Sequence, residues 1–470
     1  MCLKKPDTNF LILYSQTTLN NYISPLSNSE ILNASASDKL PKEKWRRNVA
    51  IKKVLVGIIL FGAFGSLARS PLYFLLKVSD PLNYLILFTF FGIYFIDKAV
   101  KRIGFNGMER VFLSILFGMP LYSAIVSHYF WGQPYFYGLI TTQLWFYSSV
   151  SFMLFYLLKT RQITLHMVRD IMLAICWIQL PADLMLGLFL DPRNYHDKAF
   201  AYCTAAKGGC GWMFDISFMS FAYFYYFVRF IKTNHFKYLI FVLILFAYIA
   251  FEYQKRALTA SMIATTGVYF YFNVSFSKKL YFISLFTLII SVFVSLLVLL
   301  KPEALSRVAT LYGSALEVLQ GEESGDKSAD SRITQVLYLG LFYAKHPATI
   351  IFGNGKWNDN WSGSPLSMYG RFYPSDIGIL GAYFIYGLFG ILIVQFEYFM
   401  AFLWMRKVKE AAGDAFFHAL KYYLLFFWVR SIPTGGSYFY PGAGITAVII
   451  TLLYFYRYRE KKSEMNYVLE

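Results

Sequence analysis

The sequence has little charge for its length. Of its 470 residues only 15% are Asp, Glu, Lys or Arg, whereas 57% are hydrophobic and 20% are aromatic. An ordinary soluble domain carries about 25% charged and about 45–50% apolar residues. A water-exposed surface has no room for so much additional apolar side-chain area. The composition therefore excludes a water-soluble protein and predicts a polytopic membrane protein.

Cysteine and the common catalytic signatures are also scarce. The chain has 4 cysteines, with no Cys/His spacing typical of a zinc site, no Gly-rich phosphate loop ending in Lys-Ser/Thr and no nucleophile elbow. ATP-driven transport and zinc chemistry are therefore unsupported, and we expect neither a metal nor a cofactor. No repeat of fixed period is visible, which excludes a solenoid and disfavours an inverted-repeat transporter.

Positive charge is in excess, because 44 Lys and Arg face 27 Asp and Glu and the net charge is +17. In a membrane protein this excess belongs in cytoplasmic loops, so we expect no nucleic-acid partner. Apolar stretches long enough to cross roughly 30 Å of hydrocarbon are then the main structural signal. They lie at 54–76, 81–97, 111–131, 135–157, 168–190, 212–231, 236–252, 257–276, 279–300, 376–405, 415–431 and 438–456.

The basic clusters set the predicted orientation. If segment 1–53 is cytoplasmic, the alternate connections that follow are cytoplasmic too, and these carry the Lys and Arg clusters. We therefore predict an all-α bundle of about twelve transmembrane helices with both termini cytoplasmic. Nine helices fall in 54–300 and three in 376–456, and 457–470 forms a cytoplasmic tail. The remaining connection, 301–375, is too long to be a mere connector and is predicted to be one large loop on the outer side.

Arginines on the outer side are informative because positive charge there opposes the orientation rule and is costly near lipid. Arg256 starts the span 257–276 and Arg430 ends the span 415–431. An alternative interpretation is that both side chains extend to the interface and fix the depth of their helices. Arg256 is also placed to pair with Glu252 at a spacing of four residues.

The long loop carries further arginines and ends on a carboxylate. Arg332 precedes an amphipathic stretch, and Arg371 lies in the closing segment Tyr369-Gly370-Arg371-Phe372-Tyr373-Pro374-Ser375-Asp376. The planar fork of Arg binds phosphate oxygens through two hydrogen bonds and stays charged when partly desolvated. A carboxylate at the membrane boundary can accept a hydroxyl proton. The pattern fits a diphosphate site with a base, or else a solvated loop with ordinary charges.

Two local patterns accompany Arg256. Ten residues separate Arg256 from Gly267, and Arg256 itself lies in Lys255-Arg256-Ala257-Leu258-Thr259. The spacing is similar to the arginine-plus-ten-plus-glycine pattern of some O-antigen polymerases. The five-residue segment resembles the Ser-Arg-Thr helix start of the O-antigen polymerase and ligase family, bacterial membrane enzymes of surface-polysaccharide assembly.

Two more patterns follow in the same order as in that family. Ser331-Arg332, His346-Pro347 and Phe352-Gly353-Asn354-Gly355 are similar to the family's arginine, helix, Asn-Pro and Gly-rich turn. Ser375-Asp376-Ile377-Gly378-Ile379-Leu380 with Tyr386-Gly387-Leu388-Phe389-Gly390 resembles the start of its helix after the loop. The likeness covers residues 250–400 in motif and the rest of the chain only in hydropathy.

The resemblance implies a metal-independent glycosyltransferase of the bacterial inner membrane that acts on the periplasmic side, where 301–375 would be the large periplasmic loop. Its donor would be an oligosaccharide linked to undecaprenyl diphosphate, and the growing glycan would pass to the next lipid-linked repeat unit. Arg256 and Arg332 would contact the diphosphate, with Arg371 assisting and Arg430 as a further candidate. Membrane lipids and a chain-length regulator are the expected partners. The product is left open between O-antigen, capsule and exopolysaccharide.

One departure from the family bears on the reaction. Ligases of the family carry a His just before the helix that follows the loop, where this chain has Ser375 and then Asp376. The resemblance thus favours a polymerase and leaves the base open between Asp376, Tyr373 and His346. His346 is better explained as a solvent-facing loop residue. The alternatives are a ligase that transfers glycan to lipid A–core, a flippase or transporter of the lipid-linked oligosaccharide, and a non-enzymatic scaffold.

Two further pairs of residues are predicted to have structural roles. Cys203 and Cys210 flank a short loop that the predicted orientation places in the oxidising periplasm, so they are candidates for a structural disulfide. Asp183 and Asp215 fall within or at the edge of spans, where an unpaired carboxylate is costly. We expect them to hold helices together.

Overall fold

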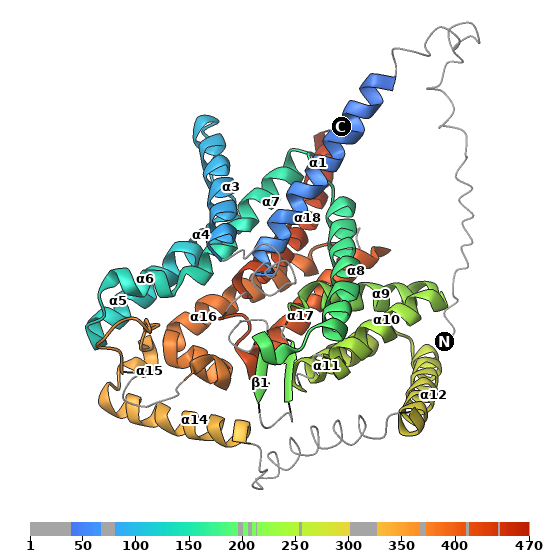
Figure 1. Ribbon diagram of the computed structural model, residues 1–470. Helices are drawn as coiled ribbons and strands as arrows, with labels where there is room; N and C mark the ends of the chain where they lie inside the picture. The colour runs from blue at the N-terminus through green and yellow to red at the C-terminus, as the bar shows by residue number, and fades with distance from the viewer. Residues whose placement is uncertain are drawn as a thin grey trace, which may run out of the picture. The chain divides into compact units, whose positions relative to one another are not determined.

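The computed structural model describes residues 39–66, 80–195, 201–204, 209–212, 214–252, 256–300, 327–365, 373–409, 413–439 and 442–469. Residues Val54–Glu470 form one compact unit, separate from Met1–Lys53. The predicted helical fold is confirmed, with one short β-hairpin among the described residues (Figure 1).

The first half of the chain is helical up to the hairpin. Asn106 caps α4 (Gly107–Leu113) by accepting a hydrogen bond from Glu109 N, while the Glu109 carboxylate accepts from Asn106 N. Gly132 follows the last residue of α5 (Met119–Trp131), and its own backbone is in the left-handed region, at φ 76°. The elements are α1 (Lys39–Ala63), α3 (Asp80–Val100), α4 (Gly107–Leu113), the π-helical turn η1 (Ser114–Gly118), α5 (Met119–Trp131), α6 (Tyr135–Thr141), the 3-10 segment η2 (Gln143–Ser149), α7 (Val150–Lys159), α8 (Leu165–Phe189) and η3 (Pro192–Tyr195).

The second half begins with the antiparallel hairpin of β1 (Ala201–Thr204) and β2 (Gly209–Trp212). The elements that follow are α9 (Ser217–Thr233), α10 (Phe236–Ala247), η5 (Tyr248–Glu252), α11 (Arg256–Asn273), α12 (Phe276–Leu300), α14 (Lys327–Lys345), α15 (Thr349–Phe352), η7 (Pro374–Ile377), α16 (Ile379–Arg406), α17 (Ala415–Thr434) and α18 (Gly442–Leu469). Each predicted span from 81–97 onward overlaps a helix. The span 54–76 is described only as far as Ser66.

Three helical stretches of the described chain are long and apolar enough to cross a membrane: Gly107–Trp131, α8 and α16. Large apolar side chains also point outward on several helices, with Leu85 63% exposed, Leu188 77% and Leu392 57%. Outward Leu on long apolar helices is expected where the surrounding solvent is lipid.

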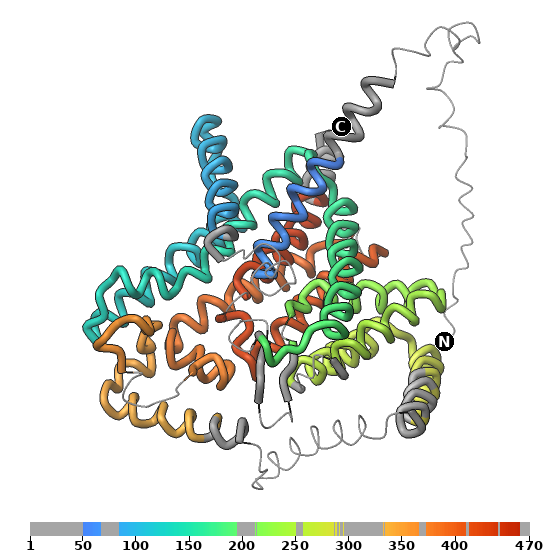
Figure 2. Tube along the Cα trace, viewed as in Figure 1, coloured from blue at the N-terminus to red at the C-terminus, as the bar shows by residue number. Residues whose placement is uncertain are grey.

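The core lies where α9, α17 and α18 pack together, with α10 lying beside α9 (Figure 2). Helix α9 is apolar on all sides and is buried from Ser217 to Val228, as expected of a helix enclosed by others. Aromatic contacts join it to α17, with ring centroids 5.4 Å apart for Phe224 and Phe426. The interior is thus held by ring packing between helices distant in sequence.

Helix α17 has a defined start and a defined end. Asp414 caps its start by accepting a hydrogen bond of 2.8 Å from Phe416 N, and Gly435 ends it at φ 62°. A helix of 20 residues is about 30 Å long. Groups at its first and last turns are therefore separated by about the thickness of a hydrocarbon core.

Candidate functional site

A break in α16 receives the loop that follows α15. Gly387 has non-helical angles inside α16, at φ 61° and ψ −174°. Asn354 N donates to Phe384 O at 2.9 Å, and Gly355 N donates to Ile385 O at 2.8 Å. A helix break leaves carbonyl groups without their usual partners, and the loop N–H groups satisfy two of them. The Gly-rich turn and the glycine run of the next helix, which are separate motifs in the sequence, are therefore in contact.

The same loop is tied to α5 on its other side. Asn354 accepts from Trp131 Nε1 at 3.1 Å and donates through Nδ2 to Phe384 O, so one buried side chain joins α5 to α16. Gln133 donates to Lys356 O at 3.1 Å and accepts from Asn358 N at 2.8 Å. Buried polar groups with partners on both sides fix a loop in one conformation. This part of the long connection is thus a firm support for the segments on either side.

Two backbone contacts bring three distant segments together. Gln335 of α14 accepts a hydrogen bond of 3.1 Å from Tyr373 N. Gly378, at φ +63°, lies so close to the end of α17 that a Cβ would fall 2.5 Å from Ile432 O. Helix α14, η7 and the last turn of α17 therefore meet at one place.

We call the chemically active residues on these three adjoining segments the arginine shelf: Arg332, Tyr373, Asp376 and Arg430. Arg332 lies three residues before Gln335 and so on the same face of α14. Asp376 lies two residues before Gly378, and Arg430 lies two residues before Ile432. The shelf combines two guanidinium groups, a carboxylate and a phenol.

The shelf is accessible, and one of its arginines is only partly engaged. Arg332 and Asp376 are exposed, and Tyr373 is 57% exposed. Arg430 is half-buried, with its guanidinium carbon 5.7 Å from the centre of the Phe427 ring. Its buried Nε has no hydrogen-bond partner among the described residues. A buried donor of this kind is usually satisfied in the functional state, and an anion is the natural partner of a guanidinium.

The other predicted residues lie elsewhere or are only partly described. His346 packs against the ring of Trp131 at 4.9 Å, eleven residues beyond Gln335 and so about 16 Å further along α14. The structure therefore groups Tyr373 and Asp376 with the arginines and places His346 apart. Arg371 lies outside the described residues. Arg256 is described only as the first residue of α11.

Helix α11 lies against α17 and has its end beside the first half of that helix. Its last residue, Asn273, donates to the hydroxyl of Tyr422 in α17, and the Tyr269 ring packs edge-to-face on Tyr422 with centroids 4.8 Å apart.

Tyr223 and Phe227 of α9 contact Thr266 and Tyr269 in turn, so α11 runs parallel to α9. Lys232 near the end of α9 interacts with Asp414 at the start of α17, so both α9 and α11 run antiparallel to α17. The start of α11 at Arg256 therefore points toward the end of α17 that carries Arg430.

The two cysteines occupy paired positions in the hairpin. Cys203 of β1 lies directly opposite Cys210 of β2. Directly opposite residues of an antiparallel pair have Cα atoms about 4.5–5.5 Å apart, which is within the range of a disulfide. The register agrees with the predicted bond, which stays a prediction.

The buried aspartates hold segments together, as expected. Asp215 accepts from Ser66 Oγ at 2.5 Å and from Ser217 Oγ at 2.7 Å. Asp183 of α8 accepts from Tyr248 Oη of η5 at 3.3 Å. Both carboxylates therefore have neighbouring hydroxyl donors in the interior.

Sequence reasoning missed Gln335 and Gly378, which bring the shelf together. The one available signal for Gln335 is its spacing of three residues from Arg332, and a lone Gln in an amphipathic helix has many explanations. Comparison with known proteins adds no assignment: the chain matches no known family model and no curated protein. The functional argument therefore rests on the shelf itself.

Proposed function

We propose that this protein is a polysaccharide polymerase of the bacterial inner membrane. It would transfer a growing glycan from undecaprenyl diphosphate onto the next lipid-linked repeat unit at the periplasmic face. The observation that carries the proposal is the arginine shelf, where Arg332, Asp376 and Arg430 come from three segments far apart in sequence. In this proposal the bundle has about twelve transmembrane helices, and α14, α15 and η7 belong to the large periplasmic loop.

Glycosyl transfer needs positive charge for the leaving diphosphate and a base for the acceptor hydroxyl, and the shelf contains both kinds of group. A hydroxyl of the acceptor sugar attacks the anomeric carbon of the donor, and the bond from that carbon to the diphosphate oxygen breaks. The bonding electrons leave with the diphosphate, whose charge Arg332 and Arg430 neutralise. The hydroxyl proton passes to the Asp376 carboxylate, with Tyr373 beside it as the alternative acceptor. Arg256, at the start of α11, and Arg371 are proposed to assist with the diphosphate.

The glycine contact gives secondary support. The Gly-rich turn at Gly353 and the glycine run at Gly387 are two of the features that resemble the O-antigen polymerase and ligase family. Their contact in the fold suggests that they form one structural unit, which anchors both α14 and the start of α16. A unit of this kind holds shelf residues in place, since a site needs rigid support to position reacting groups.

The test is complementation of a strain that lacks this protein. Arg332→Ala and Asp376→Asn should each replace the polysaccharide ladder by single repeat units, which accumulate on the carrier at the outer face. Arg193→Ala, which removes an exposed arginine from η3, is the control and should keep the ladder. Membrane levels of every variant are measured by immunoblot so that loss of polymer is not confused with loss of protein.

The outcomes separate the alternatives. A normal ladder with both shelf variants at normal protein levels would contradict the proposal. Long polymer that remains on the carrier and is missing from the surface would indicate the ligase. Repeat units that accumulate on the cytoplasmic side would indicate the flippase.

A further inference from the structure

A second polar region lies at the start of α17, about 30 Å from the shelf end of the same helix. It is a pocket of about 470 Å³ between the α7–α8 loop, the first residues of α8, the start of α17 and the second half of α18. Pockets of this size accommodate small molecules or the polar end of a lipid. We call it the basic pocket and define it by Lys159, Arg161, His166, Asp414 and Arg459.

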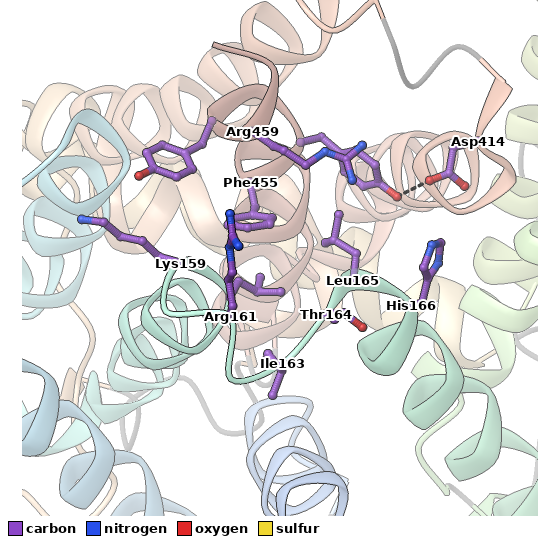
Figure 3. Close-up of a pocket in the computed structure, with 12 residues that line it drawn as sticks. Lys159, Arg161, Ile163, Thr164, Leu165, His166, Asp414, Phe455 and Arg459 are labelled. Carbon is purple, nitrogen blue, oxygen red and sulfur yellow. Dashed lines mark hydrogen bonds between the residues drawn. The ribbon is translucent and has the colours of Figure 1, made fainter. Parts of the chain in front are cut away.

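The pocket combines cations with an apolar floor. Figure 3 shows Arg161 and Arg459 near the ring of Phe455, with Lys159 to one side and His166 to the other. The apolar and aromatic lining residues are Leu158, Ile163, Leu165, Phe455, Tyr456 and Tyr458. A purely solvated charge cluster needs no such floor, whereas a ligand with one anionic and one apolar part is complementary to both halves.

The two carboxylates in or near the pocket, Asp414 and Glu460, already accept hydrogen bonds from other groups of the protein. Asp414 accepts from Tyr456 Oη at 2.5 Å and caps α17 through Phe416 N. Glu460 accepts from Lys409 N at 2.6 Å and lies 3.6 Å from the guanidinium of Arg457.

Neither Arg161 nor Arg459 has a carboxylate within ion-pair distance in the part of the chain that the structure describes. Lys159 has none there either. The pocket lining therefore holds three cations and one carboxylate, that of Asp414, with no ion pair to these cations among the described residues. This excess of positive charge favours an external anion.

The backbone at Arg161 also points to a specific requirement for this side chain. Arg161 follows the end of α7 with φ 57°, in the left-handed region where Gly or Asn is usual. A residue with a Cβ is disfavoured in this conformation, because the Cβ lies too close to the following carbonyl oxygen. Glycine would make the turn at lower cost and would remove the guanidinium from the pocket, so the strain is consistent with a binding role.

We propose that the basic pocket binds a phosphate-bearing ligand. Arg161 and Arg459 hold the phosphate, Lys159 adds positive charge at the rim, and the apolar part of the ligand lies against Phe455 and Ile163. The phosphate belongs to the headgroup of an anionic membrane lipid or to a soluble phosphorylated compound, since both present the same oxygens to a guanidinium. The site lies at the other end of α17 from the arginine shelf and does not depend on the proposed glycosyl transfer.

The experiment measures ligand binding to the purified full-length chain in a neutral detergent. Native mass spectrometry follows the retention of phosphatidylglycerol and of diacylglycerol, which has similar acyl chains and no phosphate. A parallel titration with inorganic phosphate tests whether the free anion displaces the lipid. Wild-type protein should prefer phosphatidylglycerol over diacylglycerol by at least about tenfold, because only the former offers a phosphate for charge-assisted hydrogen bonds with the two guanidinium groups.

Variants locate the site. Arg161→Gln/Arg459→Gln should weaken phosphatidylglycerol binding at least about tenfold. Arg161→Lys/Arg459→Lys keeps the charge and should retain most of the binding. Arg406→Gln is the matched control, because it removes an exposed arginine at the end of α16, outside the pocket lining, and should bind as wild type does.

Each outcome has a meaning. Displacement of the lipid by inorganic phosphate supports a soluble phosphorylated ligand, and tight lipid binding that free phosphate does not displace supports a headgroup. Equal retention of phosphatidylglycerol and diacylglycerol by wild type, with no phosphate effect, overturns the proposal even if the variants fail to fold. Unchanged binding by the folded Gln double variant overturns it as well.

Discussion

Gly353 and Gly387 lie back to back, so that a Cβ built on Gly353 would fall 2.4 Å from the backbone nitrogen of Gly387. Both residues have positive φ, +77° and +61° respectively. Each glycine therefore meets two requirements at once, a left-handed backbone and a backbone contact too close for any side chain. This contact joins the loop after α15 to the break in α16.

Substitution of either glycine by alanine should destabilise the protein. Gly353→Ala and Gly387→Ala each place a Cβ against backbone atoms that cannot move aside, at an unfavourable φ. We expect a loss of at least about 2 kcal/mol in the free energy of unfolding. Gly340→Ala is the control, since Gly340 lies in α14 with open space around its Cα. The measurement is thermal unfolding in detergent, and a loss for Gly340→Ala equal to that for Gly353→Ala would contradict the argument.

The sequence predicts the helices well because apolar length is a local property. The predicted span 168–190 and helix α8 at Leu165–Phe189 differ by only a few residues at each end. The break at Gly387 is different, because the surrounding sequence reads as one continuous apolar run. Only the partner loop at Gly353 reveals why the helix is interrupted, and such a contact between distant segments has no periodicity.

The candidate site is predictable in its residue types and not in its grouping. Arg332, Asp376 and Arg430 stand out because charge is rare in this chain. Their proximity depends on the hydrogen bond from Tyr373 N to Gln335 and on the contact of Gly378 with Ile432, which involve backbone and a neutral side chain. His346 is nearer to Asp376 in sequence than Arg332 is, yet it packs against Trp131, so distance along the chain is a poor guide here.

The buried ion pair between Lys98 and Glu109 should matter far more than the exposed pair next to it. Glu109 also accepts hydrogen bonds from Tyr94 Oη and from Asn106 N, and its side chain is 1% exposed. Lys98→Met leaves this carboxylate buried without its cation, which should cost about 3–5 kcal/mol of stability.

The control is Lys101→Met, because Lys101 pairs with Asp97 at 2.5 Å while its side chain is 51% exposed. An exposed pair of this kind contributes about 0–1 kcal/mol. The double variant Lys98→Met/Glu109→Gln should recover part of the loss, since it removes both charges. Chemical or thermal unfolding measures all three, and equal effects of Lys98→Met and Lys101→Met would show that burial of the pair is unimportant.

Lys356 should make stability rise with pH. Burial lowers the pKa of its ammonium group from 10.5 to about 8, and Asp359 partly opposes this shift. Between about pH 8 and about pH 10.5 the unfolded chain therefore binds a proton at this residue that the folded protein does not. Stability contributed by this group increases with pH over that window and is lower below it.

The comparison of wild type with Lys356→Met isolates this effect from other titrating groups. The stability difference between the two proteins should change in favour of wild type as the pH rises through the window. Lys345→Met, at the exposed end of α14, is the control and should retain the pH dependence of wild type. A Lys356→Met variant with the wild-type pH profile would show that the ammonium group is not perturbed by its surroundings.

The register of the hairpin makes a sharp prediction about Cys203 and Cys210. Because the two residues are directly opposite, oxidation should join them within one chain without a change of backbone. Mass spectrometry after alkylation under non-reducing conditions should therefore find the peptides of Cys203 and Cys210 linked, and Cys176, which is buried in α8, as a free thiol.

The chain from Cys203 to Cys210 closes a short loop, so the stabilisation should be modest, about 2–3 kcal/mol by the chain-entropy relation. Cys203→Ser and Cys210→Ser should lower the unfolding temperature equally, and the double variant should match the single ones because all three lose the same bond. Two reactive thiols at these positions in protein isolated from an oxidising compartment would refute the pairing, and with it one argument for placing the hairpin on the periplasmic side.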